Sequence, residues 1–382
     1  MRYTWSEEQR LLRDTVERYV IENLGFAARR DKPQTPRAAW RDMASLGLLG
    51  VAFDERYGGG GGSPLDTVLV MEAFGRGPVV EPYVSTVVLG GGVLRHAGDE
   101  ALKAELIPKL IAGDTLFSFA YAEPRSRFNL ANVELRAQTV GNGYELSGQK
   151  IVVYGGPEAD VLFVSARTAG DTRDRDGISL FMVPADAAGV SRQDYQTMDG
   201  LTASEIAFDR VRVPAEAIVG EPGGALPTIE RVIDDAIVAV CAEAVGAMSA
   251  LNERCVEYCK TRVAFGQPIS KFQVVQHRLV DMHVAYEQVA ALTLRAALAL
   301  DQDPVSRGRA VAAAKVQLGQ DAVFVGKNGV QLHGAIGMTE DLDVGHFFKR
   351  ITMINSLFGP VEHQLRRYRE LRGHNEGAAR GH

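Results

Sequence analysis

The spacing of hydrophobic residues changes twice along the chain, and these changes divide it into three regions. Over residues 1–114 the apolar residues recur at intervals of three and four, which is typical of amphipathic helices. Ser6 and Gln9 have the spacing of a capping box and predict the start of the first helix. Further helices are expected from Pro36 to Gly47 and over 64–75, 82–96 and 99–112. This region is predicted to be an N-terminal α-helical domain.

Residues 115–222 have a different pattern, in which short segments alternate between apolar and polar residues or are apolar throughout. Asn142 and Gly143 stand between two of these segments and are a strong signal for a hairpin turn. The expected strands lie at 116–121, 133–140, 144–147, 150–154, 160–167, 178–183 and 205–213. Several short strands separated by turns predict a small β-barrel or sandwich as the central domain.

Helical spacing returns after Gly224, and residues 223–372 are predicted to form a C-terminal helical domain. Long helices are expected at 227–262, 273–301, 304–334 and 345–370. Helices joined by short connections predict an antiparallel four-helix bundle. The last residues, 373–382, lack large apolar side chains and are expected to be a flexible tail. The fold class is therefore α+β, with a helical domain, a β domain and a helical bundle in that order.

Composition narrows the function only by exclusion. Hydrophobic residues make up 46% of the 382 residues and charged residues 24%, as in ordinary globular proteins. The 42 Lys and Arg against 48 Asp and Glu give a net charge of −6, with no basic stripe for nucleic acid. No apolar run reaches the roughly 20 residues that span a membrane, and the N-terminus has no signal-peptide core. A cytoplasmic protein without a nucleic-acid or membrane partner is expected.

The three cysteines lie within one expected helix. Cys255 and Cys259 are four residues apart on one helix face, but no matching pair of His or Cys occurs elsewhere. We interpret these two and Cys241 as reduced thiols, with a metal or redox role as the alternative. No metal site is predicted.

One stretch, from Arg262 to His277, combines several unusual signals. A helix is expected to end near Arg262, and Gly266 and Pro268 then predict a turn before the next helix. An Arg beside such a turn offers five fixed donors that suit a phosphate or pyrophosphate. Alternatively, Arg262 could cap the last carbonyls of its own helix.

Two motifs carry a resemblance to a known family. The first is Arg-x-x-Phe-Gly-x-Pro-Ile, which starts at Arg262 and is followed by Gln273 eleven residues after the Arg. The second is Gln-Leu-His-Gly-Ala-Ile-Gly, which starts at Gln331. With these motifs the chain resembles the acyl-CoA dehydrogenase flavoproteins over about residues 4–370. The resemblance implies that both segments bind the pyrophosphate and adenosine of an FAD held by a neighbouring subunit. The implied cofactor-binding residues are Arg262, Phe265, Gln273, Gln331, His333, Gly334 and Ala335.

The resemblance also implies a catalytic Glu, which this chain lacks at both of the family's positions. The family's reaction needs a carboxylate in a dry, apolar pocket to remove a proton from Cα of the thioester. One position lies in a Tyr-Glu-Gly-Thr loop before the last helix, where this chain has Phe358. The other lies 26 residues before Arg262, where it has Ala236. Neither side chain accepts a proton.

Two nearby acids, Asp235 and Glu243, are the candidates for a displaced base. Asp235 precedes Ala236, and one residue on a helix is a rotation of about 100°, so Asp235 would point away from the pocket. Alternatively, Asp235 is a solvated acid that the helix dipole stabilises. Glu243 lies on the expected face but about 10.5 Å further along the axis. Alternatively, Glu243 forms a buried hydrogen bond or a salt bridge between helices.

The segments that bind a chain's own flavin in the family are altered here. The family's Thr-Glu-Pro-x-x-Gly-Ser-Asp is replaced by Ala122-Glu-Pro-Arg-Ser-Arg-Phe-Asn129. The family's Gly-Gln-Lys-x-Trp-Ile-Thr is replaced by a segment in which Val152 takes the place of the Trp and Tyr154 that of the Thr. The FAD-binding segments that would serve the chain's own flavin are thus altered, whereas those that would serve a neighbour's flavin are retained.

This asymmetry suggests a hypothesis for the whole chain. It is similar to the small, non-catalytic subunits of heteromeric acyl-CoA dehydrogenases that act on pimeloyl-CoA or on steroid side chains. The partners implied are a homologous catalytic subunit in an α2β2 assembly with FAD, an acyl-CoA substrate and an electron-transfer flavoprotein. Two alternatives stay open, namely a homomeric enzyme that uses Glu243 or Asp235 and a flavin-free scaffold.

Two features stay undecided. The sequence does not predict which acyl-CoA is the substrate. The last helix ends in a basic segment, which is either a solvated face or a docking patch. Its arginines are Arg366, Arg367, Arg369 and Arg372.

Overall fold

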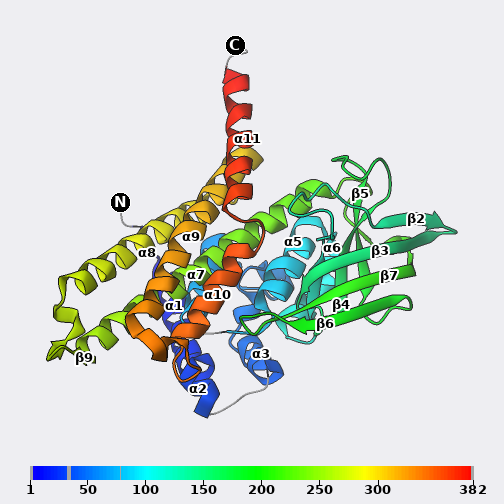
Figure 1. The fold of residues 1–382 in the computed structure, drawn as a ribbon. Helices are drawn as coiled ribbons and strands as arrows, with labels where there is room; N and C mark the ends of the chain where they lie inside the picture. The colour runs from blue at the N-terminus through cyan, green and yellow to red at the C-terminus, as the bar shows by residue number, and fades with distance from the viewer. Residues whose placement is uncertain (1–2, 32–35, 78, 380–382) are drawn as a thin grey trace. The chain divides into compact units, whose positions relative to one another are not determined.

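The computed structural model describes residues 3–31, 36–77 and 79–379. The chain divides into two compact units by its contacts. The first unit consists of Met1–Thr35, Ser63–Val79 and Ile237–His382, and the second of Pro36–Gly62 and Val80–Ala236. The order of helical, β and helical regions along the chain is the one that the hydrophobic spacing predicts (Figure 1).

The first unit is built from helices, of which the longest form a bundle (Figure 1). They are α1 (Glu7–Tyr19), α2 (Phe26–Asp31), α4 (Pro64–Gly75), the part of α7 (Leu226–Thr261) from Ile237 on, α8 (Gln273–Ala299), α9 (Pro304–His333), α10 (Val344–Ser356) and α11 (Val361–Ala379). The capping box at the start of α1 is confirmed, because the hydroxyl of Ser6 accepts from the backbone N–H of Gln9 at 3.1 Å. α8 and α9 lie side by side and are joined by a short turn.

Two glycines let α4 and α7 pack with their backbones almost in contact. A Cβ atom at Gly75 would lie 1.8 Å from the carbonyl oxygen of Glu243. A Cβ atom at Gly246 would lie 1.9 Å from the carbonyl oxygen of Glu72. Because no side chain fits at these positions, the two glycines set the distance between the helices. They also fix the position of Glu243 on α7.

The region predicted as one helix over 345–370 contains two helices, α10 and α11, with a break over 357–360. Phe358 and Gly359 have φ values of 56° and 101°, which a helix cannot include. Pro360 follows and also disfavours continuation of α10. Of the tail expected over 373–382, residues 373–379 continue α11, and residues 380–382 lie outside the described residues.

The second unit contains the shorter helices α3 (Pro36–Ser45), α5 (Gly91–Ala97) and α6 (Glu100–Ile111). The helix predicted over 82–96 begins instead as a π-helical segment, Val84–Gly90, which runs directly into α5. Hydrophobic spacing does not separate a π-helical turn from an α-helical one over so short a segment.

Eight strands of the described chain form one sheet in the order β6-β7-β3-β2-β4-β5-β8, with β1 paired to β4. They are β1 (Phe117–Ala120), β2 (Arg136–Val140), β3 (Gly143–Tyr154), β4 (Val161–Arg167), β5 (Ile178–Pro184), β6 (Val190–Gln196), β7 (Thr202–Pro214) and β8 (Ile218–Val219). The predicted middle β domain is confirmed, but the two strands predicted at 144–147 and 150–154 are one strand, β3. Its register with β7 shifts on both sides of Gly148–Lys150. β6 was missed because its side chains are exposed and polar and show no alternation.

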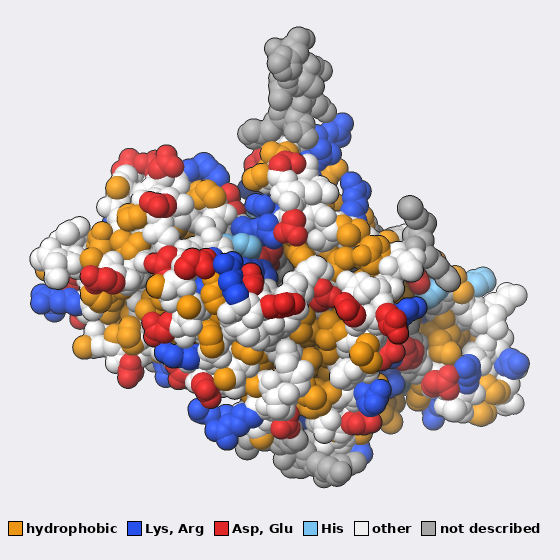
Figure 2. All heavy atoms as spheres, turned by 180° about the vertical axis from the view of Figure 1, so that it is seen from behind, with side chains coloured by type: hydrophobic (Ala, Val, Ile, Leu, Met, Phe, Trp, Pro, Cys, Tyr) orange, Lys and Arg blue, Asp and Glu red, His pale blue; other side chains and the backbone are white. Residues whose placement is uncertain are grey.

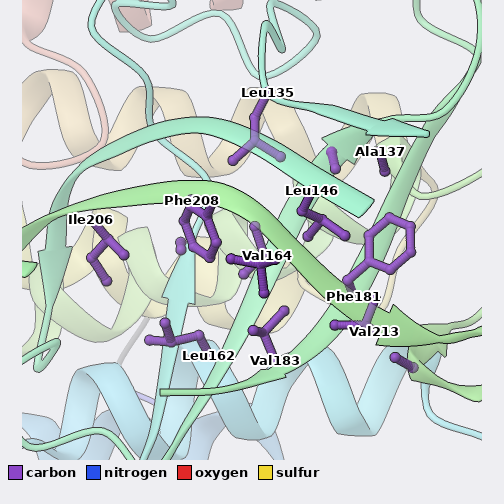
Figure 3. Packing of buried hydrophobic residues seen from close by; sticks show 14 of the residues in the cluster. Leu135, Ala137, Leu146, Leu162, Val164, Phe181, Val183, Ile206, Phe208 and Val213 are labelled. Atoms are coloured by element: carbon purple, nitrogen blue, oxygen red, sulfur yellow. The ribbon is translucent and has the colours of Figure 1, made fainter. Parts of the chain in front are cut away.

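The core of the β domain consists of apolar side chains from most of these strands. Leu146 of β3, Leu162 and Val164 of β4, and Phe181 of β5 are fully buried. Figure 3 shows them packed together with Ile206 and other side chains of β7.

Candidate functional site

The Arg262 motif forms a small hairpin between α7 and α8. Its strands are β9 (Val263–Ala264) and β10 (Gln267–Pro268), which pair antiparallel. The two residues at the tip, Phe265 and Gly266, have φ values of 53° and 79°. Positive φ at both central residues is the conformation of a type I′ hairpin turn. The turn that Gly266 and Pro268 predicted is thus confirmed, although its strands were not predicted.

Phe265 at the tip of this hairpin is 94% exposed. A bulky side chain at positive φ is uncommon, and an apolar ring with almost no cover is costly in water. Its ring makes an edge-on contact with the ring of Phe272, at 6.1 Å between centroids. The hairpin therefore presents Phe265 outward from the bundle.

Arg262 is exposed at the base of the hairpin. Its backbone N–H donates to the carbonyl of Tyr258 at 2.8 Å, and its carbonyl accepts from the N–H of Ile269 at 2.8 Å, which holds the turn. Within the described part of the chain, the guanidinium has no hydrogen bond or ion pair. The alternative that Arg262 caps its own helix is therefore not observed. Gln273, the first residue of α8, is likewise exposed.

The second motif lies at the C-terminal end of α9. Gln331, Gly334 and Ala335 are exposed there. Gly334 has φ 68° and ψ −144°, a conformation open almost only to glycine, and no atom lies within 4 Å of the place of its missing Cβ. A ligand can therefore approach the backbone of Gly334 closely. The methyl group of Ala335 takes up some of the space beside it.

His333 is the one residue of this motif whose side chain faces the protein interior. It is 5% exposed, and its Nδ1 lies 2.8 Å from the carbonyl oxygen of Gly329. Its ring stacks on Tyr258 at 4.4 Å, and the Tyr258 hydroxyl donates to the His333 carbonyl at 3.3 Å. His333 thus joins the ends of α7 and α9 and positions the other motif residues. We had expected it to contact the cofactor, but its ring is not at the surface.

Together the two motifs place an unpaired cation, two amide side chains and an open backbone at one end of the bundle. These groups donate hydrogen bonds, and a guanidinium binds phosphate oxygens well. The donor set therefore fits the pyrophosphate and adenosine of an FAD. The surface is presented away from the chain's own core, as binding to a neighbour's cofactor requires.

The two positions of the family's catalytic Glu are apolar and buried. Ala236 is 0% exposed, and Phe358 is 7% exposed. The carbonyl of Phe358 accepts from the side chain of Gln364 at 2.7 Å. Phe358 has φ 56°, so the loop between α10 and α11 has an unusual backbone at this position, even though the residue there is not the family's Glu.

Asp235 is held by three basic side chains of its own unit. Its carboxylate lies 2.6 Å from Arg95, 2.8 Å from His96 and 3.0 Å from Arg231. Burial alone would raise the pKa of Asp235, but the hydrogen bond from His96 and the charges of the two arginines hold this pKa well below its usual range. Asp235 is thus not the solvated acid that we considered. It is 6% exposed, and its fixed negative charge makes it a poor proton acceptor.

Glu243 forms a buried, bidentate salt bridge with Arg350. The guanidinium Nε lies 2.5 Å from Oε1 and a terminal nitrogen lies 2.6 Å from Oε2. Both residues are at most 8% exposed. This is the salt bridge between helices that we considered for Glu243, and it joins α7 to α10. Both carboxylate oxygens are occupied, so the geometry speaks against Glu243 as a base.

The altered flavin segments of the β domain still lie next to each other. The N–H of Ile151 donates to the carbonyl of Ala122 at 2.9 Å. Lys150 and Glu123, both fully or almost fully buried, form an ion pair at 2.7 Å. The carboxylate of Glu123 also accepts from the backbone N–H of Leu135 at 3.1 Å. The scaffold of this surface is therefore assembled, and the differences from the family concern side chains on it.

Those side chains do not suit a flavin. Arg127 and Val152 stand in place of the family's Gly and Trp, and both have φ 51°. Val152 is 40% exposed, as is Phe128. A branched aliphatic side chain cannot stack on a flavin as the family's Trp does, and it cannot donate a hydrogen bond.

Several residues that shape the site could not be found from the sequence. Tyr258 holds the bundle end through His333, and Arg350 holds Glu243, but no local motif marks either residue. The same holds for Arg95 and His96, whose partner Asp235 lies about 140 residues further along the chain. In the described ranges, no group of three or more His, Cys, Asp and Glu residues could hold a metal ion. No described helix combines the length and the apolar character needed to cross a membrane.

Comparisons with known proteins identify the family. The models of the acyl-CoA dehydrogenase N-terminal, middle and C-terminal domains match residues 6–114, 118–211 and 227–370. Mitochondrial isovaleryl-CoA dehydrogenase of Pongo abelii is 31% identical over 355 residues, which cover 90% of this chain and 84% of that protein. The structure of butyryl-CoA dehydrogenase from Megasphaera elsdenii superimposes with a TM-score of 0.89 at 26% identity, covering 96% of this chain and 98% of that one. The structure of the Tcur3481-Tcur3483 steroid ACAD gives a TM-score of 0.86 at 27% identity, covering 98% and 99%. The chain therefore belongs to the acyl-CoA dehydrogenase family, whose cofactor is FAD.

Proposed function

We propose that this chain is the non-catalytic subunit of a heteromeric acyl-CoA dehydrogenase. In this proposal it completes the FAD site of a homologous catalytic subunit within an α2β2 assembly. The reaction is the α,β-desaturation of an acyl-CoA thioester. A bound FAD would supply the acceptor for the hydride from Cβ, and the partner would contribute the acyl pocket and the base that takes the proton from Cα.

The observation that carries the proposal is the contrast between the two halves of the site. The exposed groups at the bundle end, led by Arg262, have the donors for a neighbour's FAD. The positions that serve the chain's own reaction hold Ala236 and Phe358, which cannot accept a proton. A chain with only the first half needs a partner that has the second.

The role of each bundle-end residue follows from its chemistry. Arg262 donates to the pyrophosphate, and its charge offsets one of the two negative charges there. Gln273 and Gln331 donate to the remaining polar groups of the nucleotide, and the open backbone at Gly334 lets the adenosine approach. Phe265 covers the cofactor and excludes water.

The two alternative functions are less well supported. A homomeric enzyme would need Asp235 or Glu243 as its base, but both are held in ion pairs. A flavin-free scaffold would have no use for an exposed, unpaired Arg262 beside the other motif residues. The name of the Tcur3481-Tcur3483 steroid ACAD joins two components and agrees with a two-chain assembly.

Other parts of the proposal rest on the family alone. An electron-transfer flavoprotein would reoxidise the flavin, and the acyl group is left open. Cys241, Cys255 and Cys259 are buried free thiols, which fits a reducing cytoplasm.

Substitution of Arg262 in the mixed assembly tests the proposal. The chain is produced together with candidate catalytic acyl-CoA dehydrogenase subunits, and the flavin content of the assembly is measured after gel filtration. Arg262→Ala should reduce the bound flavin by at least about tenfold, because a charge-assisted contact to phosphate is lost. Lys271→Ala is the matched control, since Lys271 is another exposed cation on the same connection between α7 and α8. Retention of flavin in the Arg262→Ala assembly would contradict the proposal.

A further inference from the structure

The first unit has a cavity of about 330 Å³ where the end of α8, the start of α9 and α11 meet. Its polar lining comes from Arg295 near the end of α8, Gln302 in the connection that follows, Ser306 and Arg309 on α9, and Tyr368 on α11. Leu298 and several alanines form its apolar part. None of these residues belongs to the motifs of the candidate FAD site.

The cavity also lies far from that site. The FAD motifs are at the C-terminal end of α9, whereas the cavity is at its N-terminal end. α9 has 30 residues, and at about 1.5 Å per residue the two ends are roughly 45 Å apart. A ligand in the cavity would therefore be separate from FAD.

Positive charge is concentrated at the cavity. The guanidinium carbon of Arg309 lies 5.5 Å from the centre of the Tyr368 ring, and the buried Nε of Arg309 has no hydrogen-bond partner among the described residues. A hydrogen bond from Arg309 is the largest effect on the Tyr368 hydroxyl and lowers its pKa. Burial acts in the opposite direction, and the charges of Arg309, Arg372 and Arg295 add to the lowering of the pKa. Three arginines therefore act on one hydroxyl.

Among the side chains that the structure describes, no carboxylate lines the cavity to balance these charges. The nearest acid before α9, Asp303, is engaged with the backbone. It accepts from the N–H groups of Val305 and Ser306, each at 3.0 Å. The middle turns of α11 carry the basic segment that the sequence left undecided, and Figure 2 shows blue side chains around this part of the helix.

We propose that this cavity binds a small organic phosphate of about mononucleotide size. Arg295 and Arg309 bind the phosphate oxygens, and the hydroxyls of Ser306 and Tyr368 complete the contact. Guanidinium groups match the geometry of phosphate oxygens, and a cavity of this volume falls in the range of small-ligand sites. The apolar part beside Leu298 takes the body of the ligand. This site goes beyond the proposed function and does not depend on it.

Isothermal titration of the full-length protein with AMP, inorganic phosphate and adenosine tests the site. We expect saturable binding of AMP, weaker binding of inorganic phosphate and none of adenosine. Arg295→Gln and Arg309→Gln should each weaken AMP binding by at least about tenfold. Arg295 is exposed, so its variant should fold even if the Arg309 variant does not.

Two controls separate this site from the rest of the chain. Arg366→Gln removes an exposed arginine of α11 that does not line the cavity, and it should leave AMP binding unchanged. Arg262→Gln removes the central donor of the candidate FAD site and should also leave it unchanged. The inference is wrong if AMP does not bind saturably, if adenosine binds as well as AMP, or if Arg262→Gln abolishes the binding that Arg295→Gln leaves intact.

Discussion

Val152 is a branched residue in a backbone conformation that favours glycine. Its φ of 51° falls in the left-handed region, where the Cβ atom crowds the backbone. It lies in β3 where the register with β7 is irregular, and its side chain is 40% exposed. Little packing therefore compensates for the strain at this position.

Replacing Val152 with glycine should stabilise the protein. The relief of strain is expected to be up to about 1 kcal/mol, because left-handed geometry costs most residues about 1–2 kcal/mol. The measurement is the free energy of unfolding in urea. Val140→Gly is the matched control, since Val140 is 42% exposed in the neighbouring strand β2 but is not at positive φ. That variant should lose about 0.5–1 kcal/mol. Equal losses in both variants would show that Val152 is not strained.

For Asp235 and Glu243, the two acids considered as displaced bases, the sequence predicted the position of each residue but not the side chains around it. Their positions on α7 were readable from helical spacing. Their environments were not, because Arg95 and Arg350 are about 140 and 107 residues away along the chain. The sequence allowed a solvated Asp235 and a paired Glu243, and the structure shows both to be paired and buried.

The pair of Glu243 and Arg350 should be costly to break. Arg350→Met leaves a buried carboxylate without its cation, and a loss of about 3–5 kcal/mol in unfolding free energy is expected. Replacing both residues, with Glu243→Leu added, should recover most of that loss. Lys260→Met is the control, because it breaks an exposed pair with Glu257 on the same helix and should change stability by less than about 1 kcal/mol. A loss as small as that of the control would contradict the arrangement described here.

At the scale of elements, the long helices were the most predictable. The expected bounds of the helix at 227–262 differ from those of α7 by one residue at each end. Strong helical spacing and the turn signals of Gly266 and Pro268 explain this agreement. The break between α10 and α11 was missed as a helix boundary, although Gly359 and Pro360 are signals for a helix end. The positive φ of Phe358 was not readable from the sequence.

One buried lysine stabilises the end of α10 just before this break. Lys315 of α9 is 1% exposed, and its ammonium donates to the carbonyls of Ile354 at 2.6 Å and Asn355 at 3.0 Å. The carbonyl of Ile354 also accepts from the backbone N–H of Leu357 at 3.2 Å, and Lys315 adds a second cap to this end of α10 from another helix. Burial lowers the pKa of Lys315 to about 8.

The lowered pKa of Lys315 gives a pH-dependent contribution to stability. Between about pH 8 and pH 10.5 the unfolded chain keeps the proton that the folded chain releases, so this contribution rises with pH. The difference in unfolding free energy between the natural protein and Lys315→Met should therefore increase as pH rises from 7.5 to about 10, by up to about 3 kcal/mol. Urea titrations at several pH values measure it. A difference that stays constant or decreases with pH would contradict the prediction.

At the scale of the whole molecule, the sequence indicated three successive regions, and the contacts group the chain into two units. Periodicity reveals the type of each segment but not which segments pack together. For example, α4 lies in the N-terminal region, yet it packs on α7 through Gly75 and Gly246. The retained half of the site was predictable, because its motifs are short and local. The cavity at the start of α9 was not, because its lining comes from three helices.

The central claim is that this chain completes another subunit's flavin site and has none of its own. The most direct measurement is flavin content per chain, from the visible spectrum together with the native mass, for the protein alone and for the protein assembled with a catalytic subunit. We predict that the chain alone is colourless and that the mixed α2β2 assembly contains one FAD for each pair of chains. One FAD per chain in the protein alone would contradict the account.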